Sequence, residues 1–248
     1  MKKNFFLFFF LFSIFLYPKN NETEIDSLFP KISEKVDNIN QLIPEGWSLF
    51  DKSEGDLNKD KLDDIALIIE KNDEKNIITY LVMGKHEETL NFNPRVIIIL
   101  FQEKDGKYVV ASKNTKGFIV NSSSYFTREK IPTEDVLNNY ANFFNDPYFG
   151  ICIKNNTLHI SFLCDFYNSE NNELREYVFR YQNRHFELIG YEYTHFSYGI
   201  YRNICSDNYS TGKRKIETIE NEKLKEVKWE KIKNPKMILD DMGPFFDS

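Results

Sequence analysis

From Pro44 onward, short apolar runs alternate with polar positions, which is the pattern of half-buried β-strands. The runs are rich in Val, Ile, Phe and Tyr, and turn-prone residues separate them. Such spacing is typical of antiparallel hairpins. The pattern therefore predicts a mainly β fold of the α+β class, with antiparallel strands in one domain. The expected strands are residues 47–50, 65–70, 77–83, 95–102, 108–112, 150–154, 158–164, 176–182, 185–193 and 224–232.

Two of the connections carry a clear turn signal. The sequence "KDG" lies between Phe101 and Tyr108, and the pair "NN" lies between Ile153 and Leu158. Gly and Asn tolerate the left-handed backbone that tight hairpin turns require. We expect a hairpin at each place.

Two segments show helical spacing instead. Residues 24–43 carry apolar side chains at steps of four, four and three, which predicts an amphipathic N-terminal helix, although Pro30 disfavours its first turn. Residues 133–149 show a similar period behind Thr133, a residue type that caps helices, and this predicts one short internal helix. The two apolar stripes are Leu28, Ile32, Val36 and Ile39, and Val136, Tyr140 and Phe143 or Phe144.

The N-terminal residues have the pattern of a secretory signal. Two lysines precede a run from Asn4 to Tyr17 that consists mostly of Phe, Leu and Ile. The run is too short to span a bilayer comfortably. We predict a signal peptide over 1–19, a single mainly β domain over 20–248, and export to the periplasm or the extracellular space. The alternative is that the segment remains as an N-terminal anchor.

The net charge limits the possible binding partners, and the cysteine count limits disulfide pairing. The chain of 248 residues has a net charge of −6, which argues against electrostatic binding to nucleic acid. Membrane contact would come only through an uncleaved N-terminal segment. The three cysteines, Cys152, Cys164 and Cys205, are an odd number, so at least one thiol stays free.

One segment carries an unusual density of acidic residues. "GDLNKDKLDD", residues 55–64, holds four aspartates and an asparagine, and carboxylates this close repel one another unless water or a cation lies among them. Asp56, Asn58, Asp60 and Asp64 occupy positions 1, 3, 5 and 9 of a loop, and the backbone carbonyl of Leu62 is at position 7. Calcium takes about six to eight oxygen ligands, and a tight loop directs alternate side chains inward. The spacing predicts a structural Ca²⁺ site.

The type of calcium loop follows from what surrounds it. An EF-hand is disfavoured, because Leu instead of Glu stands at position 12 and a strand pattern follows the loop. Within "SLFDKSEGDLNKDKLDDIALII", the loop resembles the calcium loops of FG-GAP and VCBS-type repeats. This resemblance implies that Asp56, Asn58, Asp60 and Asp64 are side-chain ligands and that Leu62 is a carbonyl ligand.

The loop departs from that family at one position. The family usually carries Gly after the third acidic position, where the backbone is left-handed, and this chain has Lys61, at a cost of about 1 kcal/mol. A single motif also cannot build a complete propeller, which needs several blades of about 40–60 residues. The alternative interpretation of the loop is a solvated acidic turn.

Two functional hypotheses of different class follow. The first is an exported binding or structural protein whose calcium ion orders the surrounding hairpin. Its partner would be a protein or a glycan, since five Phe and Tyr residues between Tyr191 and Tyr201 could stack on sugar rings, although alternating aromatics in β proteins more often fill the core.

The second hypothesis is an exported hydrolase with a cryptic Cys/His or Ser/His site. Hairpin pairing could bring His159 near Cys152 or Cys164, which would pair a nucleophile with a base. No motif identifies such a pair, and we predict no catalytic residue.

Overall fold

The structure is a computed structural model that describes residues 31–82, 86–121, 146–165, 171–197 and 201–244. The predicted signal peptide over 1–19 lies outside these residues. The predicted internal helix over 133–149 also lies outside them up to residue 145, and it is wrong at its described end, where residues 148 and 149 are in a strand. Among the helices of the described residues, none is long and apolar enough to cross a membrane.

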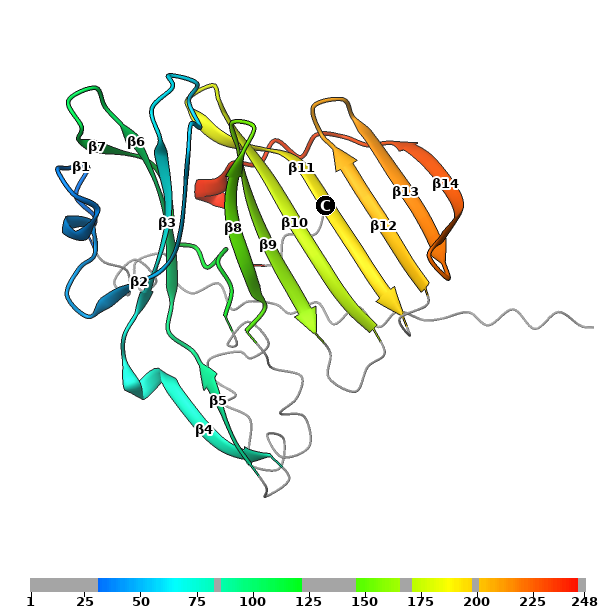
Figure 1. The fold of residues 1–248 in the computed structure, drawn as a ribbon, viewed down its shortest axis with the longest axis horizontal. Coiled ribbons are helices and arrows are strands. Elements are labelled where there is room, and N and C mark those ends of the chain that lie inside the picture. Colours follow the sequence, from blue (N-terminus) through cyan, green and yellow to red (C-terminus); the bar gives the residue numbers. More distant parts are fainter. Residues whose placement is uncertain (1–30, 83–85, 122–145, 166–170, 198–200, 245–248) are drawn as a thin grey trace, which may run out of the picture.

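Five strands form the first sheet, in the order β1–β7–β6–β3–β2, and every neighbouring pair is antiparallel. Figure 1 shows this sheet on the left of the molecule. Its strands are β1 (Lys35–Val36), β2 (Trp47–Gly55), β3 (Asp64–Lys71), β6 (Arg95–Gln102) and β7 (Tyr108–Asn114).

Seven strands form the second sheet, and their order in space follows the chain from β8 to β14. Each strand pairs with the next along the chain, so the sheet is an antiparallel meander whose outermost strand, β14, lies far from the first sheet (Figure 1). A separate hairpin joins β4 (Ile77–Val82) to β5 (His86–Asn91). The strands of the meander are β8 (Tyr148–Lys154), β9 (Thr157–Asp165), β10 (Asn171–Gln182), β11 (His185–Ser197), β12 (Tyr201–Asn208), β13 (Lys213–Glu220) and β14 (Lys223–Lys231).

The main hydrophobic core joins the two sheets. Side chains from one face of β3 and β6 pack with Phe118 and with aromatic residues of β9 and β10. The Phe118 ring contacts Phe162, Tyr177 and Phe179 edge to face, with centroid separations of 5.7, 5.2 and 5.8 Å. Edge-to-face pairs add to the stabilisation that burial provides.

The central strands β3 and β6 are buried on both faces. Their other face packs on a second cluster that includes Val36 and Leu42. A strand that is covered on both sides has no solvent-exposed face that would favour polar residues. This explains why residues 65–69 and 96–100 are unbroken apolar runs.

The predicted N-terminal helix is wrong for its described part, residues 31–43. This stretch forms β1 and the 3₁₀ helix η1 (Ile39–Leu42). Val36 is buried where β1 pairs with β7, so an extended backbone completes the edge of the first sheet. Asn38 then caps η1 with its side chain. Of the predicted helical stripe, this strand and turn bury Val36 and pack Ile32 and Ile39, which are partly buried, against the same cluster.

All ten predicted strands are confirmed, and so are the two hairpin turns. Asn155 and Asn156 have φ values of 52° and 57°, and Gly106 has a φ of 80°, as tight turns require. Strands β1, β5, β12 and β13 were not predicted as strands. The sequences of β12 and β13 are polar at most positions, and much of their length lies beyond the core, so apolar alternation is absent there.

Candidate metal centre

The acidic segment forms the loop between β2 and β3. Gly55 and Asp64, which flank it, are directly paired across the two strands. The loop backbone also contacts the second sheet, since the side-chain amide of Asn156 donates to the Asp56 carbonyl at 2.7 Å. A Cβ atom at Gly55 would lie 2.8 Å from the Ile153 side chain, so only glycine permits this approach. The loop is thus held between the two sheets.

Asp64 organises the loop from inside. Its side chain is fully buried at the start of β3. One carboxylate oxygen accepts the backbone N–H groups of Leu57 (2.8 Å) and Asn58 (3.2 Å), and the other accepts that of Gln102 (3.1 Å). Burial raises the pKa of the Asp64 carboxyl above its ordinary value, and the backbone N–H groups offset only part of this rise.

Asp56 folds the first half of the loop onto itself. Its Oδ1 accepts the N–H of Lys59 at 2.6 Å, and its Oδ2 accepts the N–H of Lys61 at 3.1 Å. One carboxylate therefore holds two backbone donors, and charge assistance strengthens both hydrogen bonds.

Asn58 and Asp60 continue the same pattern two residues apart. Asn58 Oδ1 accepts the N–H of Asp60 at 2.9 Å, and Asp60 Oδ1 accepts the N–H of Leu62 at 2.8 Å. The Asn58 amide donates to Asp60 Oδ2 at 3.0 Å. These Asx turns explain why short polar side chains recur at alternate positions.

Two lysines adopt the left-handed backbone within this loop. Lys61 has a φ of 72°, as the resemblance implied, and Lys59 has a φ of 70°, which the sequence analysis missed. The sequence carried a signal for Lys59 as well. Lys59 follows Asn58 and precedes Asp60, just as Lys61 follows Asp60 and precedes Leu62, so the same side-chain contact spans each lysine. Each non-glycine residue costs about 1 kcal/mol in this region, so the side-chain hydrogen bonds must offset strain at two positions.

The donor set suits calcium in its chemistry. The five predicted ligands offer only carboxylate, carboxamide and carbonyl oxygens, which a hard cation prefers. Asn58, Asp60 and Leu62 also line an open pocket of about 540 Å³, together with Glu103 and Asp105 of the β6–β7 turn. Within the described residues, however, no group of three or more His, Cys, Asp and Glu side chains is placed to hold a metal ion. The carboxylates of the loop instead contact its backbone N–H groups.

A second polar cluster surrounds His159 on the second sheet. The ring nitrogens contact Thr157 Oγ1 (Nε2, 2.9 Å) and Glu176 Oε1 (Nδ1, 2.6 Å). The hydrogen bond from His159 lowers the pKa of the Glu176 carboxyl, and Lys154, 3.6 Å away, adds to this effect. The Thr157 hydroxyl donates to the Lys154 carbonyl at 2.7 Å, so its hydrogen points away from the imidazole.

This geometry bears on the hydrolase hypothesis. Cys152 is directly opposite His159 in the β8–β9 pair, as hairpin pairing suggested, and Cys152 is exposed. Both ring nitrogens of His159 already have partners, however, and the side chains of Thr157 and His159 are buried. A base that already has two partners is poorly placed to activate a neighbouring thiol.

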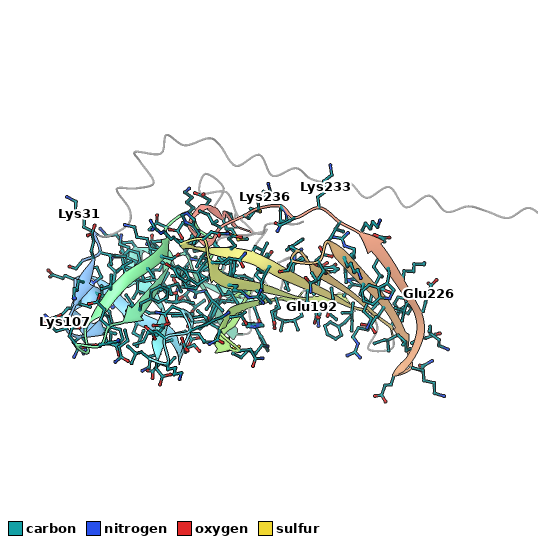
Figure 2. The ribbon with its side chains drawn as sticks, turned by 90° about the horizontal axis from the view of Figure 1, so that it is seen from above. Lys31, Lys107, Glu192, Glu226, Lys233 and Lys236 are labelled. Atoms are coloured by element: carbon teal, nitrogen blue, oxygen red, sulfur yellow. The ribbon has the colours of Figure 1, made fainter. Side chains whose placement is uncertain are left out.

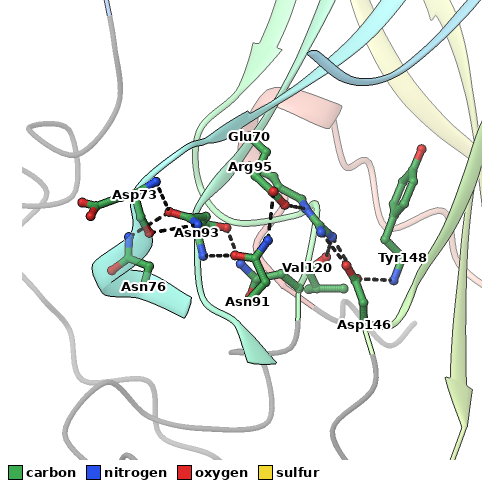
Figure 3. Close-up of polar contacts among 10 residues, drawn as sticks. Glu70, Asp73, Asn76, Asn91, Asn93, Arg95, Val120, Asp146 and Tyr148 are labelled. Carbon is green, nitrogen blue, oxygen red and sulfur yellow. Dashed lines mark hydrogen bonds and ion pairs between the residues drawn. The ribbon is translucent and has the colours of Figure 1, made fainter. Parts of the chain in front are cut away.

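The third cluster centres on Arg95, which is only 3% exposed (Figure 3). Its Nε donates to Glu70 at 2.7 Å, and its two terminal nitrogens form a bidentate pair with Asp146. Nη1 also donates to the Val120 carbonyl at 3.0 Å, and the guanidinium lies 3.9 Å from the centre of the Phe50 ring. Burial alone would lower the pKa of Arg95, but Asp146 and Glu70 outweigh burial and raise it.

A ladder of amides extends this Arg95 cluster toward the 3₁₀ helix η2 (Glu74–Asn76). The Asn91 amide donates to Glu70 at 2.9 Å, and Asn93 accepts from Asp73 N–H at 3.2 Å (Figure 3). These contacts are satisfied within the protein, so we interpret the cluster as structural.

The aromatic segment proposed for sugar binding begins at Tyr191 and Tyr193, and both side chains have partners within the protein. Tyr191 is buried in the main core, 4.9 Å from Tyr177 between ring centroids. Tyr193 is half-buried and donates its hydroxyl to Glu173 at 2.7 Å. These two rings do not form an exposed stacking surface.

Comparison with known proteins gives no match. No protein-family model, curated protein or solved structure matches this chain. The resemblance of the β2–β3 loop to FG-GAP calcium loops therefore rests on its residues and their spacing alone.

Proposed function

We propose that the chain is an exported β-sheet protein with a structural or binding role, and that the β2–β3 loop binds a calcium ion that stabilises its hairpin. The observation that carries the proposal is the left-handed backbone at Lys59 and Lys61. In this proposal the loop accepts backbone strain at both positions because a bound ion needs the five candidate ligands on one turn. The N-terminal residues 1–19 support export.

In this proposal the loop side chains, which now accept the loop's own backbone N–H groups, would coordinate the ion instead. Asp56, Asn58, Asp60 and Asp64 would supply side-chain oxygens, and Leu62 would supply its carbonyl. Bound calcium would neutralise the carboxylates of the loop. We assign the ion a stabilising role because the loop contacts both sheets: Asp64 accepts the Gln102 N–H, and the Asp56 carbonyl accepts from Asn156. The expected result of binding is a more stable protein.

The first test is thermal unfolding of the purified protein in chelator and across a calcium titration. Calcium at one hundred times its dissociation constant adds about 2.7 kcal/mol, which is a rise of roughly 5–10 °C for a chain of this size. Asp60→Ala should lower stability slightly in chelator, because the contact to Leu62 N–H is lost. It should also abolish most of the rise with calcium.

A matched control separates ligand loss from turn loss. Asp73 accepts the N–H of Lys75 at 3.1 Å with the same two-residue spacing, but it caps η2 and lies outside the loop. Asp73→Ala should lower the melting temperature and keep the full calcium response. A wild-type melting temperature that is the same in calcium and chelator would contradict the proposal.

The calcium response should weaken in mild acid. The raised pKa of Asp64 means that its folded form holds a proton more tightly than the unfolded chain does, so without calcium its contribution to stability falls as the pH rises through that pKa. Calcium favours the ionised form and must displace this proton. We expect the apparent dissociation constant, measured by calorimetry as the pH is lowered from neutral toward the pKa of Asp64, to rise as the pH falls, with release of protons on binding. A dissociation constant that stays unchanged down to the onset of acid unfolding would contradict this displacement of a proton from Asp64.

A further inference from the structure

The outer edge of the second sheet is available for pairing. β14 is the last strand of the meander, and among the described strands only β13 pairs with it. Figure 2 shows the end of the sheet that carries Glu226 curving away from the rest of the molecule. All nine residues of β14 are exposed, and Trp229 and Val227 are 64% and 40% exposed. An extended edge with exposed apolar side chains is a template for another strand.

The direction of the free hydrogen-bonding groups follows from the ladder. Ile232 N–H donates to the Gly212 carbonyl at 3.0 Å, so Ile232 faces β13. Residues of an antiparallel strand alternate between the two neighbours. The N–H and C=O groups of Val227, Trp229 and Lys231 consequently point to the open side. A register shift near Thr218 leaves the segment after it, from Glu226, regular.

The charges of this regular segment alternate in a self-complementary way. Glu226, Lys228 and Glu230 share one face of the strand, and Val227 and Trp229 share the other. Lys228 contacts Glu226 on its own strand at 3.0 Å in the isolated chain. Lysines on an edge commonly prevent pairing, but Lys228 would meet a glutamate of a second copy that runs antiparallel.

We infer that the protein forms a symmetric homodimer by antiparallel pairing of β14 with β14 of a second copy, centred on Trp229. In this register Trp229 faces its own symmetry mate, and Lys228 faces Glu230 of the other copy in both directions. The register uses the outward-pointing groups of Val227, Trp229 and Lys231 as its hydrogen-bonded pairs. The two seven-stranded sheets then become one continuous sheet.

The alternative register, centred on Val227, fits less well. It would place Trp229 opposite Lys225, and Lys225 lies in the irregular region of β14. It would also set Lys223 against Lys231, a like-charge pair that destabilises a cross-strand contact. Because a single strand from each copy makes a small interface, the dimer should be concentration-dependent.

The test is sedimentation velocity of the purified protein from low micromolar to several hundred micromolar concentration. Wild type should shift from monomer to dimer. Lys228→Glu should be monomeric throughout, because the introduced carboxylate would face Glu230 of the second copy, and Glu230→Lys should be monomeric for the opposite reason. An equimolar mixture of these two variants should dimerise, since every facing pair is again of opposite charge.

Lys223→Glu is the matched control. It changes the net charge as Lys228→Glu does but lies outside the regular segment of β14, so dimerisation should persist. Melting temperatures close to that of the wild type would show that each variant is folded. A wild-type monomer at every concentration would overturn the inference. So would a dimer that survives Lys228→Glu, or a mixture of the two variants that stays monomeric.

Discussion

Arg95→Met should be among the most destabilising single substitutions in this protein. The change removes a buried guanidinium that pairs with Glu70 and Asp146 and bonds the Val120 carbonyl. Removing one partner of a buried ion pair costs about 3–5 kcal/mol, because the remaining charges lose their partner. Met keeps much of the side-chain length, so the loss should reflect charge and hydrogen bonds more than volume. Urea denaturation monitored by circular dichroism measures the difference in unfolding free energy.

The control for Arg95→Met is an exposed ion pair on the same sheet. Lys107 lies 2.9 Å from Asp37, and the two side chains are 44% and 67% exposed. Lys107→Met should change stability by less than about 1 kcal/mol. Equal losses for the two variants would contradict the structural role of the Arg95 cluster. The position of Arg95 explains the difference, since it connects β6 to Val120 and Asp146, which flank residues 122–145.

Asp64→Ala should have the second largest effect, by about 2–4 kcal/mol. The substitution leaves the backbone N–H groups of Leu57, Asn58 and Gln102 without the carboxylate that now accepts from them. An unsatisfied buried donor costs more than a hydrogen bond usually contributes. The loss should appear in chelator as well as in calcium, which distinguishes Asp64 from Asp60. Equilibrium unfolding in both conditions measures it.

Asp63→Ala is the control for this prediction, because it removes the adjacent carboxylate from an exposed position. We expect a change within about 0.5 kcal/mol and an unaltered calcium response. A loss comparable to that of Asp64→Ala would mean that charge density in the loop matters more than the buried contacts. Asp64→Ala should also abolish calcium binding, since the buried carboxylate is one of the proposed ligands.

The sequence predicted strands best where one face of a sheet is buried. The run at 176–182 alternates because Tyr177 and Phe179 point into the core and their neighbours do not. The prediction from apolar alternation failed at β12 and β13. There Asp207 is a buried polar residue that binds Arg214 through two hydrogen bonds of 2.6 and 2.7 Å. Polar pairs of this kind replace apolar alternation and give no periodic signal.

The candidate loop shows the same division. The sequence located it between two strands, because the acidic residues are neighbours in the chain, but it did not predict the Asx turns that the same side chains make. The contact of Asp64 with Gln102 was not predicted either, since 38 residues separate the two in the chain. The Arg95 cluster was missed for this reason as well, because Asp146 and Arg95 lie 51 residues apart.

By itself the sequence determined ten of the described strands, two of the hairpin turns and the position of the acidic loop, because these depend on neighbouring residues and on side-chain periodicity. Only the tertiary structure decided that the segment around Val36 is a strand edge, that β3 and β6 are covered on both faces, and that β14 is the outermost of the described strands in its sheet. Strand order and burial arise from contacts between distant segments, and in this chain local patterns were compatible with more than one such arrangement.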